Sequence, residues 1–151
     1  MLQLNFPSYN FQLTNTQEGL KIFDRTRKKQ VLLTPEEWVR QHLIEFLVNE
    51  KKIPRTLIGV EIGLKLNTLY KRADVIAYNR NKTPLLIVEC KAPFVEISQQ
   101  TFDQIATYNM VLNVPYLMVS NGLSHFCCIM DHKNKKYTFL EEIPNYSQLC
   151  L

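Results

Sequence analysis

The stretch "PLLIVECKAP", residues 84–93, constrains the fold more than any other part of the chain. Its apolar run predicts a central strand that is buried on both faces and becomes charged where it ends. A buried carboxylate or ammonium without a partner costs several kcal/mol, so this strand end must meet water, a metal ion or other charges. Alternation gives the first face Leu85, Ile87, Glu89 and Lys91 and the second face Leu86, Val88 and Cys90.

Further strands and two helices are predicted on either side of this strand. Thr34, Pro35 and the two glutamates that follow are typical of a helix start, and this helix is expected to run to about Asn49. Ser98 is the expected cap of a second helix that ends near Leu112. Strands are predicted at 20–24, 30–33, 56–66, 70–79, 84–90, 114–120, 125–130 and 136–142.

This order of elements indicates an α/β (α+β) fold with a central mixed β-sheet flanked by helices. Residues 1–151 are expected to form a single domain, with an N-terminal hairpin at 11–33 packed on the core. The unit at 84–120 predicts a right-handed parallel crossover within the sheet. In the strand at 56–66, alternation predicts one shared face for Val60, Ile62, Leu64 and Leu66.

Composition excludes a disordered chain, because 46% of the residues are apolar and 21% are charged. No apolar run approaches the ~20 residues of a membrane helix. The N-terminus, "MLQLNFPSYNFQL", lacks a secretory signal pattern, so a cytoplasmic protein without membrane contact is expected. The four cysteines lack metal-ligand spacing, and Cys127 and Cys128 are expected to fill the core.

A second carboxylate is predicted beside Glu89. If strands 70–79 and 84–90 pair around the turn "NRNKT", Asp74 lies across from Glu89, since their midpoint falls at 81–82. Hard oxygen ligands of this kind suit a divalent cation such as Mg²⁺. A metal held by Asp74, Glu89 and the backbone carbonyl of Cys90 fits phosphodiester hydrolysis, with Lys91 stabilising negative charge. A salt-bridge cluster at the sheet edge explains the same residues, and both interpretations stay open on them alone.

Asp74 followed by Glu89-Cys90-Lys91 resembles the PD-(D/E)XK nuclease superfamily. Gln104 and Tyr108 lie four residues apart on one helix face and are similar to the extra motif of its RecB-like branch. The flanking segments resemble the N-terminal domain of type I restriction endonuclease R subunits, especially small stand-alone proteins built on it. The likeness covers roughly residues 20–125, and its segments are "LTPEEWVRQ", "KRADVIAY", "LIVECKAP", "QIATYN" and "YLMVSNG".

This resemblance implies further site residues. In related nucleases the first helix contributes an acid near the metal, for which Glu37 is the best match and Glu36 the second, although helix-start electrostatics explains both equally well. Glu61 is a further strand carboxylate that also fits a plain surface charge. Gln104 would position a ligand or a water molecule with Tyr108 in support, a role compatible with a half-buried helix face.

The resemblance has two departures. Ala73 replaces the nominal proline before the aspartate, a position that is loosely kept in the superfamily. Type I R subunits also carry a DNA-translocating, ATP-dependent motor, and this sequence has no GxxxxGK[ST] phosphate loop. A complete type I restriction activity is therefore not expected of this polypeptide.

The expected function is that of a DNA endonuclease dependent on Mg²⁺ (or Mn²⁺), in a restriction or DNA-processing system. The net charge of +4 permits an anionic partner, and Lys71 and Arg72 are candidate DNA contacts. A homodimer and separate motor or specificity subunits are possible partners. The alternatives are a non-catalytic module that keeps the nuclease fold and binds nucleic acid or protein, and a purely structural domain.

Overall fold

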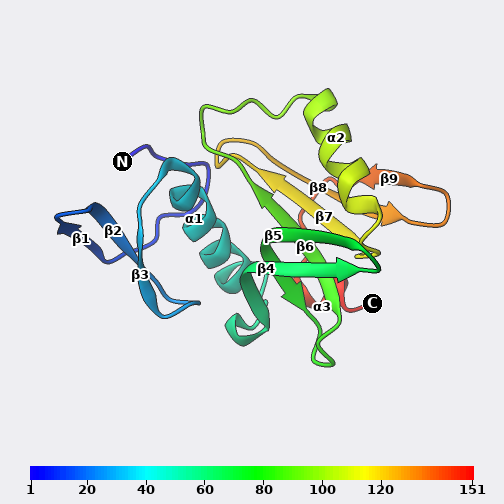
Figure 1. Ribbon diagram of the computed structural model, residues 1–151, viewed down its shortest axis with the longest axis horizontal. Coiled ribbons are helices and arrows are strands. Elements are labelled where there is room, and N and C mark those ends of the chain that lie inside the picture. Colours follow the sequence, from blue (N-terminus) through cyan, green and yellow to red (C-terminus); the bar gives the residue numbers. More distant parts are fainter.

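The computed structural model describes residues 1–151, apart from the side chain of Leu66 (Figure 1). Six strands form the main sheet in the order β4-β5-β6-β7-β8-β9, and three more form a smaller sheet in the order β1-β2-β3. The helices are α1 (Pro35–Asn49), α2 (Gln99–Met110) and α3 (Tyr146–Leu149). The strands are β1 (Leu13–Thr16), β2 (Gly19–Asp24), β3 (Lys29–Leu32), β4 (Ile58–Leu66), β5 (Leu69–Tyr78), β6 (Pro84–Cys90), β7 (Tyr116–Ser120), β8 (His125–Asp131) and β9 (Lys136–Phe139).

The main sheet is mixed, as predicted. β6 and β7 pair in parallel, and the connection between them runs through α2. The other neighbouring strands of this sheet pair antiparallel. The expected parallel crossover at 84–120 and the α+β class with a central mixed sheet are therefore confirmed.

Helix α1 begins where its capping residues predict. The Thr34 side chain accepts a hydrogen bond from the Glu37 N–H at 3.0 Å, and Pro35 occupies the first helical turn. Its apolar stripe, which includes Val39, Leu43 and Leu47, packs in a cluster with β5 and β6 side chains on one face of the main sheet. Figure 1 shows the smaller sheet on the far side of α1.

Helix α2 covers the other face of the main sheet. Ser98 caps it by accepting a hydrogen bond from the Thr101 N–H at 3.1 Å. Phe102 and Ala106 are buried in a second cluster, which includes Ile87 of β6. β6 is thus covered on both faces, as its continuous apolar run predicted. No helix in the described part of the chain is long and apolar enough to cross a membrane.

The N-terminal hairpin differs from its prediction in two ways. A third strand, β1, adds to it, and the basic turn "RTRKK" is not simply solvated. The turn forms because the buried carboxylate of Asp24 accepts hydrogen bonds from the Thr26 and Arg27 N–H groups at 2.8 Å each. Arg25 and Arg27 then reach α1, where acidic side chains are their partners, a long-range contact that local composition does not encode.

The predicted shared face in β4 is wrong. Val60 packs in the cluster on the α1 side of the sheet, whereas Ile62 and Leu64 pack in the cluster on the α2 side. The reason is Glu61, whose φ of 54° interrupts the regular pleat between them. The side chain of Leu66, the fourth member of that predicted face, lies outside the described residues.

The segment before β1 is tied to the core by buried His42 and partly buried His125. The Phe6 ring centroid lies 4.2 Å from that of His125, and the Phe11 centroid lies 4.8 Å from that of His42. His125 Nε2 is 2.8 Å from the carbonyl oxygen of Asn5, and His42 Nδ1 is 2.8 Å from that of Trp38. Burial lowers the pKa of both histidines from the ordinary value of 6.5.

Acidification is expected to destabilise this packing. Each histidine has a lower pKa in the folded state, so its contribution to stability is present above pH 6.5 and is lost as the pH falls through the folded-state pKa. The free energy of unfolding in urea should therefore fall between about pH 7.5 and about pH 5.5. The double variant His42→Gln/His125→Gln should show a flatter dependence; an unchanged slope would refute this origin.

The cysteines fill the core where the sequence predicted. Cys127 and Cys128 are buried free thiols, and burial raises the pKa of each to about 12. Both therefore stay protonated near neutral pH.

Candidate metal centre and its charge network

Asp74 lies where the β4–β5–β6 pairing opens. β5 and β6 pair from Ala77 to Val75, with Val75 opposite Val88, and the same register places Asp74 opposite Glu89. On the other side, β4 and β5 pair on both sides of Glu61 and Asp74 but not between them, because Glu61 is in the left-handed backbone region. The observed pairing stops at Val75 and Val88, and the predicted alignment of Asp74 with Glu89 is its continuation by one residue.

The Asp74 carboxylate has two partners in the surrounding structure. Its Oδ2 accepts a hydrogen bond from the Cys90 N–H at 2.7 Å, and its Oδ1 lies 3.8 Å from Nη1 of Arg40. Cys90 is fully buried, and burial raises the pKa of its thiol well above the ordinary value. The thiol is therefore no thiolate ligand, and only the main chain of Cys90 can take part in a metal site.

Glu89 is paired with a lysine that the sequence offered only as a DNA contact. Its Oε1 accepts a hydrogen bond from Lys71 Nζ, and the two side chains are 12% and 10% exposed. Burial raises the pKa of the Glu89 carboxyl, Lys71 opposes this shift, and the negative charge of Asp74 adds to it. Lys71 Nζ also lies 4.7 Å from the ring centroid of Tyr108 on α2.

Lys91 and Glu36 complete the surroundings of the two strand carboxylates. Partial burial and then the negative charge of Asp74 raise the pKa of Glu36, while Arg40 and Lys91 oppose the shift. Lys91 also lies close enough to Glu89 to act on its pKa. Among the described side chains, the Lys91 ammonium has no ion-pair partner within 4.0 Å. The backbone N–H of Lys91 donates a hydrogen bond to the Ser120 carbonyl oxygen at 2.8 Å, which fixes the strand end.

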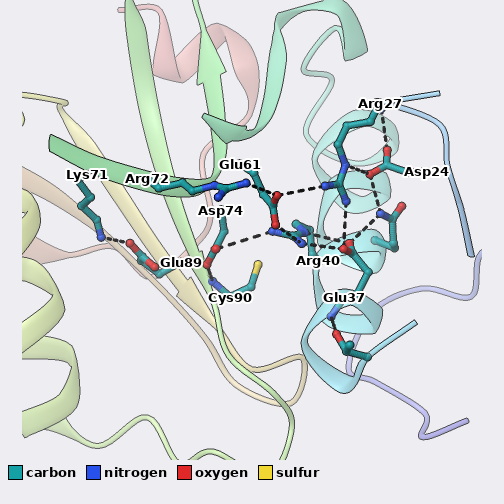
Figure 2. Close-up of polar contacts among 12 residues, drawn as sticks. Asp24, Arg27, Glu37, Arg40, Glu61, Lys71, Arg72, Asp74, Glu89 and Cys90 are labelled. Atoms are coloured by element: carbon teal, nitrogen blue, oxygen red, sulfur yellow. Dashed lines mark hydrogen bonds and ion pairs between the residues drawn. The ribbon is translucent and has the colours of Figure 1, made fainter. Parts of the chain in front are cut away.

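Glu37, the first choice among the helix acids, is engaged elsewhere. Figure 2 shows its carboxylate between two guanidinium groups. Arg40 binds both of its oxygens, with Nη2 at 2.7 Å from Oε1 and Nε at 2.9 Å from Oε2. Arg27 Nη2 and Gln41 Nε2 each add a contact at 3.0 Å. Burial alone would raise the pKa of Glu37, but these donors lower it overall.

Glu61 joins the same network from β4. Its Oε1 lies 3.2 Å from Arg40 Nη2, and its Oε2 lies 2.6 Å from Arg72 Nη2 and 3.5 Å from Arg27 Nη1. Arg40 therefore contacts carboxylates from α1, β4 and β5 (Figure 2). Arg72, a predicted DNA contact, is 62% exposed although it pairs with Glu61.

Gln104 and Tyr108 share the exposed face of α2, as their spacing predicted. Tyr108 reaches the strand carboxylates through Lys71, over whose ammonium its ring lies. Gln104 lies one turn earlier and lines a surface depression with Asp103, Thr107 and Tyr108. The structure thus brings Tyr108 to the site directly and places Gln104 on the adjoining surface.

The acids at this strand end are the candidate ligands of a divalent cation. No group of three or more His, Cys, Asp or Glu side chains is arranged to hold a metal ion among the described residues. Magnesium needs fewer protein ligands, because it keeps several waters and binds through one or two carboxylates. Asp74 and Glu89 supply two such carboxylates, which the β5–β6 register brings side by side. Burial raises the pKa of Glu89 first, and the negative charge of Asp74, which a cation would offset, adds to the shift. The donor chemistry therefore fits.

Sequence reasoning missed the guanidinium of Arg40 and the inward role of Lys71. Arg40 follows Glu37 by one helical turn, a spacing that signals a possible ion pair. Its contacts with Glu61 and Asp74 are long-range and leave no local signal. Lys71 falls in a charged pair with Arg72, and nothing in that pair distinguishes the buried member from the exposed one.

A mixed sheet with a helix on each face, and with acids and a lysine at its aligned strand ends, defines the restriction-endonuclease-like class of domain. Residues 35–144 match the family described as type I restriction enzyme R protein N terminus, and the chain belongs to that family. It is thus a nuclease-related domain of the kind found in restriction systems.

A solved structure supports the fold. The chain resembles the fragment structure of a putative HsdR subunit of a type I restriction enzyme from Vibrio vulnificus YJ016, with a TM-score of 0.54 and 20% sequence identity. The similarity covers 78% of this chain and 25% of that one. No curated protein matches the chain.

Proposed function

We propose that this chain is a DNA endonuclease domain that hydrolyses phosphodiester bonds with Mg²⁺ (or Mn²⁺). The observation that carries the proposal is the β5–β6 register, which continues to place Asp74 opposite Glu89, beside a Lys91 ammonium that forms no ion pair with the described side chains. Membership of the type I R N-terminal family supports a nuclease-related function for this domain. DNA is the proposed substrate because that family belongs to restriction enzymes.

Each residue has a distinct role in this proposal. Asp74 and Glu89 would hold the metal together with the Cys90 carbonyl, and the Cys90 N–H orients Asp74 through its 2.7 Å hydrogen bond. Glu36 is the helix acid that completes the set, since Glu37 is held by arginines. Bound there, magnesium supplies a Lewis acid and lowers the pKa of a bound water.

The remaining residues act on the substrate. The Lys91 ammonium donates to the phosphate oxygens as negative charge develops on them. Gln104 positions a ligand or a water molecule, and Tyr108 supports it from one turn further along α2. Arg72, being exposed, is the proposed phosphate contact outside the reacting group.

Partners of the domain belong to the proposal as well. The match spans 25% of the HsdR fragment, and separate motor or specificity subunits are the partners proposed for this domain. A homodimer would place two sites on one duplex and is the simplest source of a double-strand cut.

The proposal is tested by a cleavage assay on linear, circular and single-stranded DNA with Mg²⁺ or Mn²⁺. Cleavage is expected with either metal and should stop when a chelator removes it. Glu142→Ala removes an exposed carboxylate outside the site and is the control for the lost negative charge of Glu89→Ala, which should not cleave. If the chain neither cuts any of these DNAs nor binds Mn²⁺, the nuclease assignment is wrong.

A non-catalytic module is the second candidate. The observation that favours it is that Glu89 and Asp74 already have cationic neighbours, Lys71 and Arg40. Such a module would bind DNA or a protein without Mg²⁺ and would show no heat of metal binding at Asp74 and Glu89 in calorimetry. Salt-sensitive DNA binding without metal binding would favour this candidate.

A further inference from the structure

Lys71 and Glu89 form an ion pair that is nearly closed to water. Their side chains are 10% and 12% exposed, while the neighbouring Arg72 is 62% exposed. A lysine is rarely this buried, because removing its charge from water is unfavourable. Its position against a proposed metal ligand therefore calls for an explanation beyond surface charge.

We propose that Lys71 is the resident counter-cation of this site, so that a divalent metal binds Glu89 only by displacing the Lys71 ammonium. This inference rests on the proposed function, because it assigns a regulatory step to the same metal centre. It makes metal loading an exchange of one cation for another.

Electrostatics requires the exchange. The ammonium contacts Glu89 Oε1, and a divalent cation on that carboxylate would lie within a few ångströms of a like charge in a poorly hydrated place. The negative charge of Asp74 acts on Glu89 as well. Lys71 contacts Glu89 alone, and Asp74 has only the longer 3.8 Å approach of Arg40, so the two carboxylates still attract a cation that can bind both. A doubly charged ion satisfies both acids where a lysine satisfies one.

Tyr108 gives the displaced ammonium a second position. Lys71 Nζ already lies 4.7 Å from the Tyr108 ring centroid, and Tyr108 is half exposed on the surface of α2. The ammonium can thus leave Glu89 while keeping its contact with the ring and gaining water. The same face of α2 carries Gln104, so the displaced lysine lies beside the residue proposed to position a ligand or a water molecule.

The test is calorimetric titration with Mn²⁺ at about pH 8, well above the ordinary pKa of a glutamate. Lys71→Met should bind Mn²⁺ about tenfold more tightly than the parent chain, because no ammonium must be displaced. Lys65→Met is the matched control, since it removes the positive charge of an exposed lysine on β4 to which no role in the site is assigned. Its Mn²⁺ affinity should stay within about twofold of the parent value.

The outcomes distinguish a failure of the Lys71 proposal from a failure of the proposed metal centre. If the parent and Lys71→Met bind Mn²⁺ equally, or the variant binds more weakly, Lys71 is no counter-cation, although the metal centre stands. If neither chain binds Mn²⁺, the metal centre itself is wrong. Glu89→Gln should abolish binding in both backgrounds, which ties the signal to this carboxylate.

A measurement on the unaltered chain guards against a variant that fails to fold. Acylation of lysine amines, followed by mass spectrometry, should modify Lys71 slowly in metal-free protein and severalfold faster at saturating Mn²⁺. Lys133 is exposed in the turn between β8 and β9, away from the site, and provides the internal standard. A Lys71 acylation rate that Mn²⁺ leaves unchanged overturns the exchange.

Discussion

Replacing Glu89 by alanine is expected to lower Mg²⁺-dependent DNA cleavage by at least about a thousandfold, equivalent to about 4 kcal/mol of barrier. The variant loses one of the two strand carboxylates proposed to hold the metal, and β6 (Pro84–Cys90) carries no other acid that could replace it. Single-turnover cleavage of a labelled duplex measures the chemical step directly.

Asp74→Ala and Lys91→Ala test the same site from its other two sides. Asp74→Ala should match the loss at Glu89, and Lys91→Ala should lose about a hundredfold to a thousandfold, the usual cost of one charge-stabilising donor. Lys133→Ala is the lysine control because it is exposed and distant in the fold. Thermal unfolding should show that the Asp74, Glu89 and Lys91 variants are all folded. Cleavage at the parent rate by these three site variants would exclude this site.

Arg40→Met is expected to destabilise the fold by about 3–5 kcal/mol, the usual cost of removing one partner from a buried ion pair. Arg40 is buried and binds Glu37 through two hydrogen bonds, while it also contacts Glu61 and Asp74. Its loss leaves the buried Glu37 carboxylate with fewer donors, and urea unfolding at neutral pH measures the cost.

Two comparisons isolate the reason for this loss. Arg25→Met removes an arginine that is 45% exposed, and its partner Glu45 keeps Arg55, so a cost below about 1 kcal/mol is expected. Arg40→Met/Glu37→Met removes both charges and should recover part of the lost stability. If Arg40→Met unfolds at the same urea concentration as the parent chain, the network does not stabilise the fold.

Much of the fold could be predicted because its signals are local. Thr34 and Ser98 cap their helices through hydrogen bonds that span three residues, so the sequence encodes both starts. The apolar run of β6 reports burial on two faces, and the turn before it sets the register that aligns Asp74 with Glu89. These features depend on neighbours within one element or one hairpin.

The predictions that failed have two physical causes, an unusual backbone conformation and long-range contacts between charged side chains. The shared face predicted for β4 failed at Glu61, because a left-handed residue in a strand has no reliable signature when it is a glutamate. Strand β1 and the inward arginines of the "RTRKK" turn depend on contacts with β2 and α1 that composition does not report.

By itself the sequence determined which residues carry the candidate chemistry, since alternation and register bring Asp74, Glu89 and Lys91 to one end of the sheet. Only the tertiary structure decided how their charges are partnered. Glu37 forms ion pairs with Arg27 and Arg40, whereas the negative charge of Asp74 acts on Glu36. Lys71 forms an ion pair with Glu89. Long charged side chains select partners by distance and burial in the folded chain, and neither quantity is written in the spacing of residues.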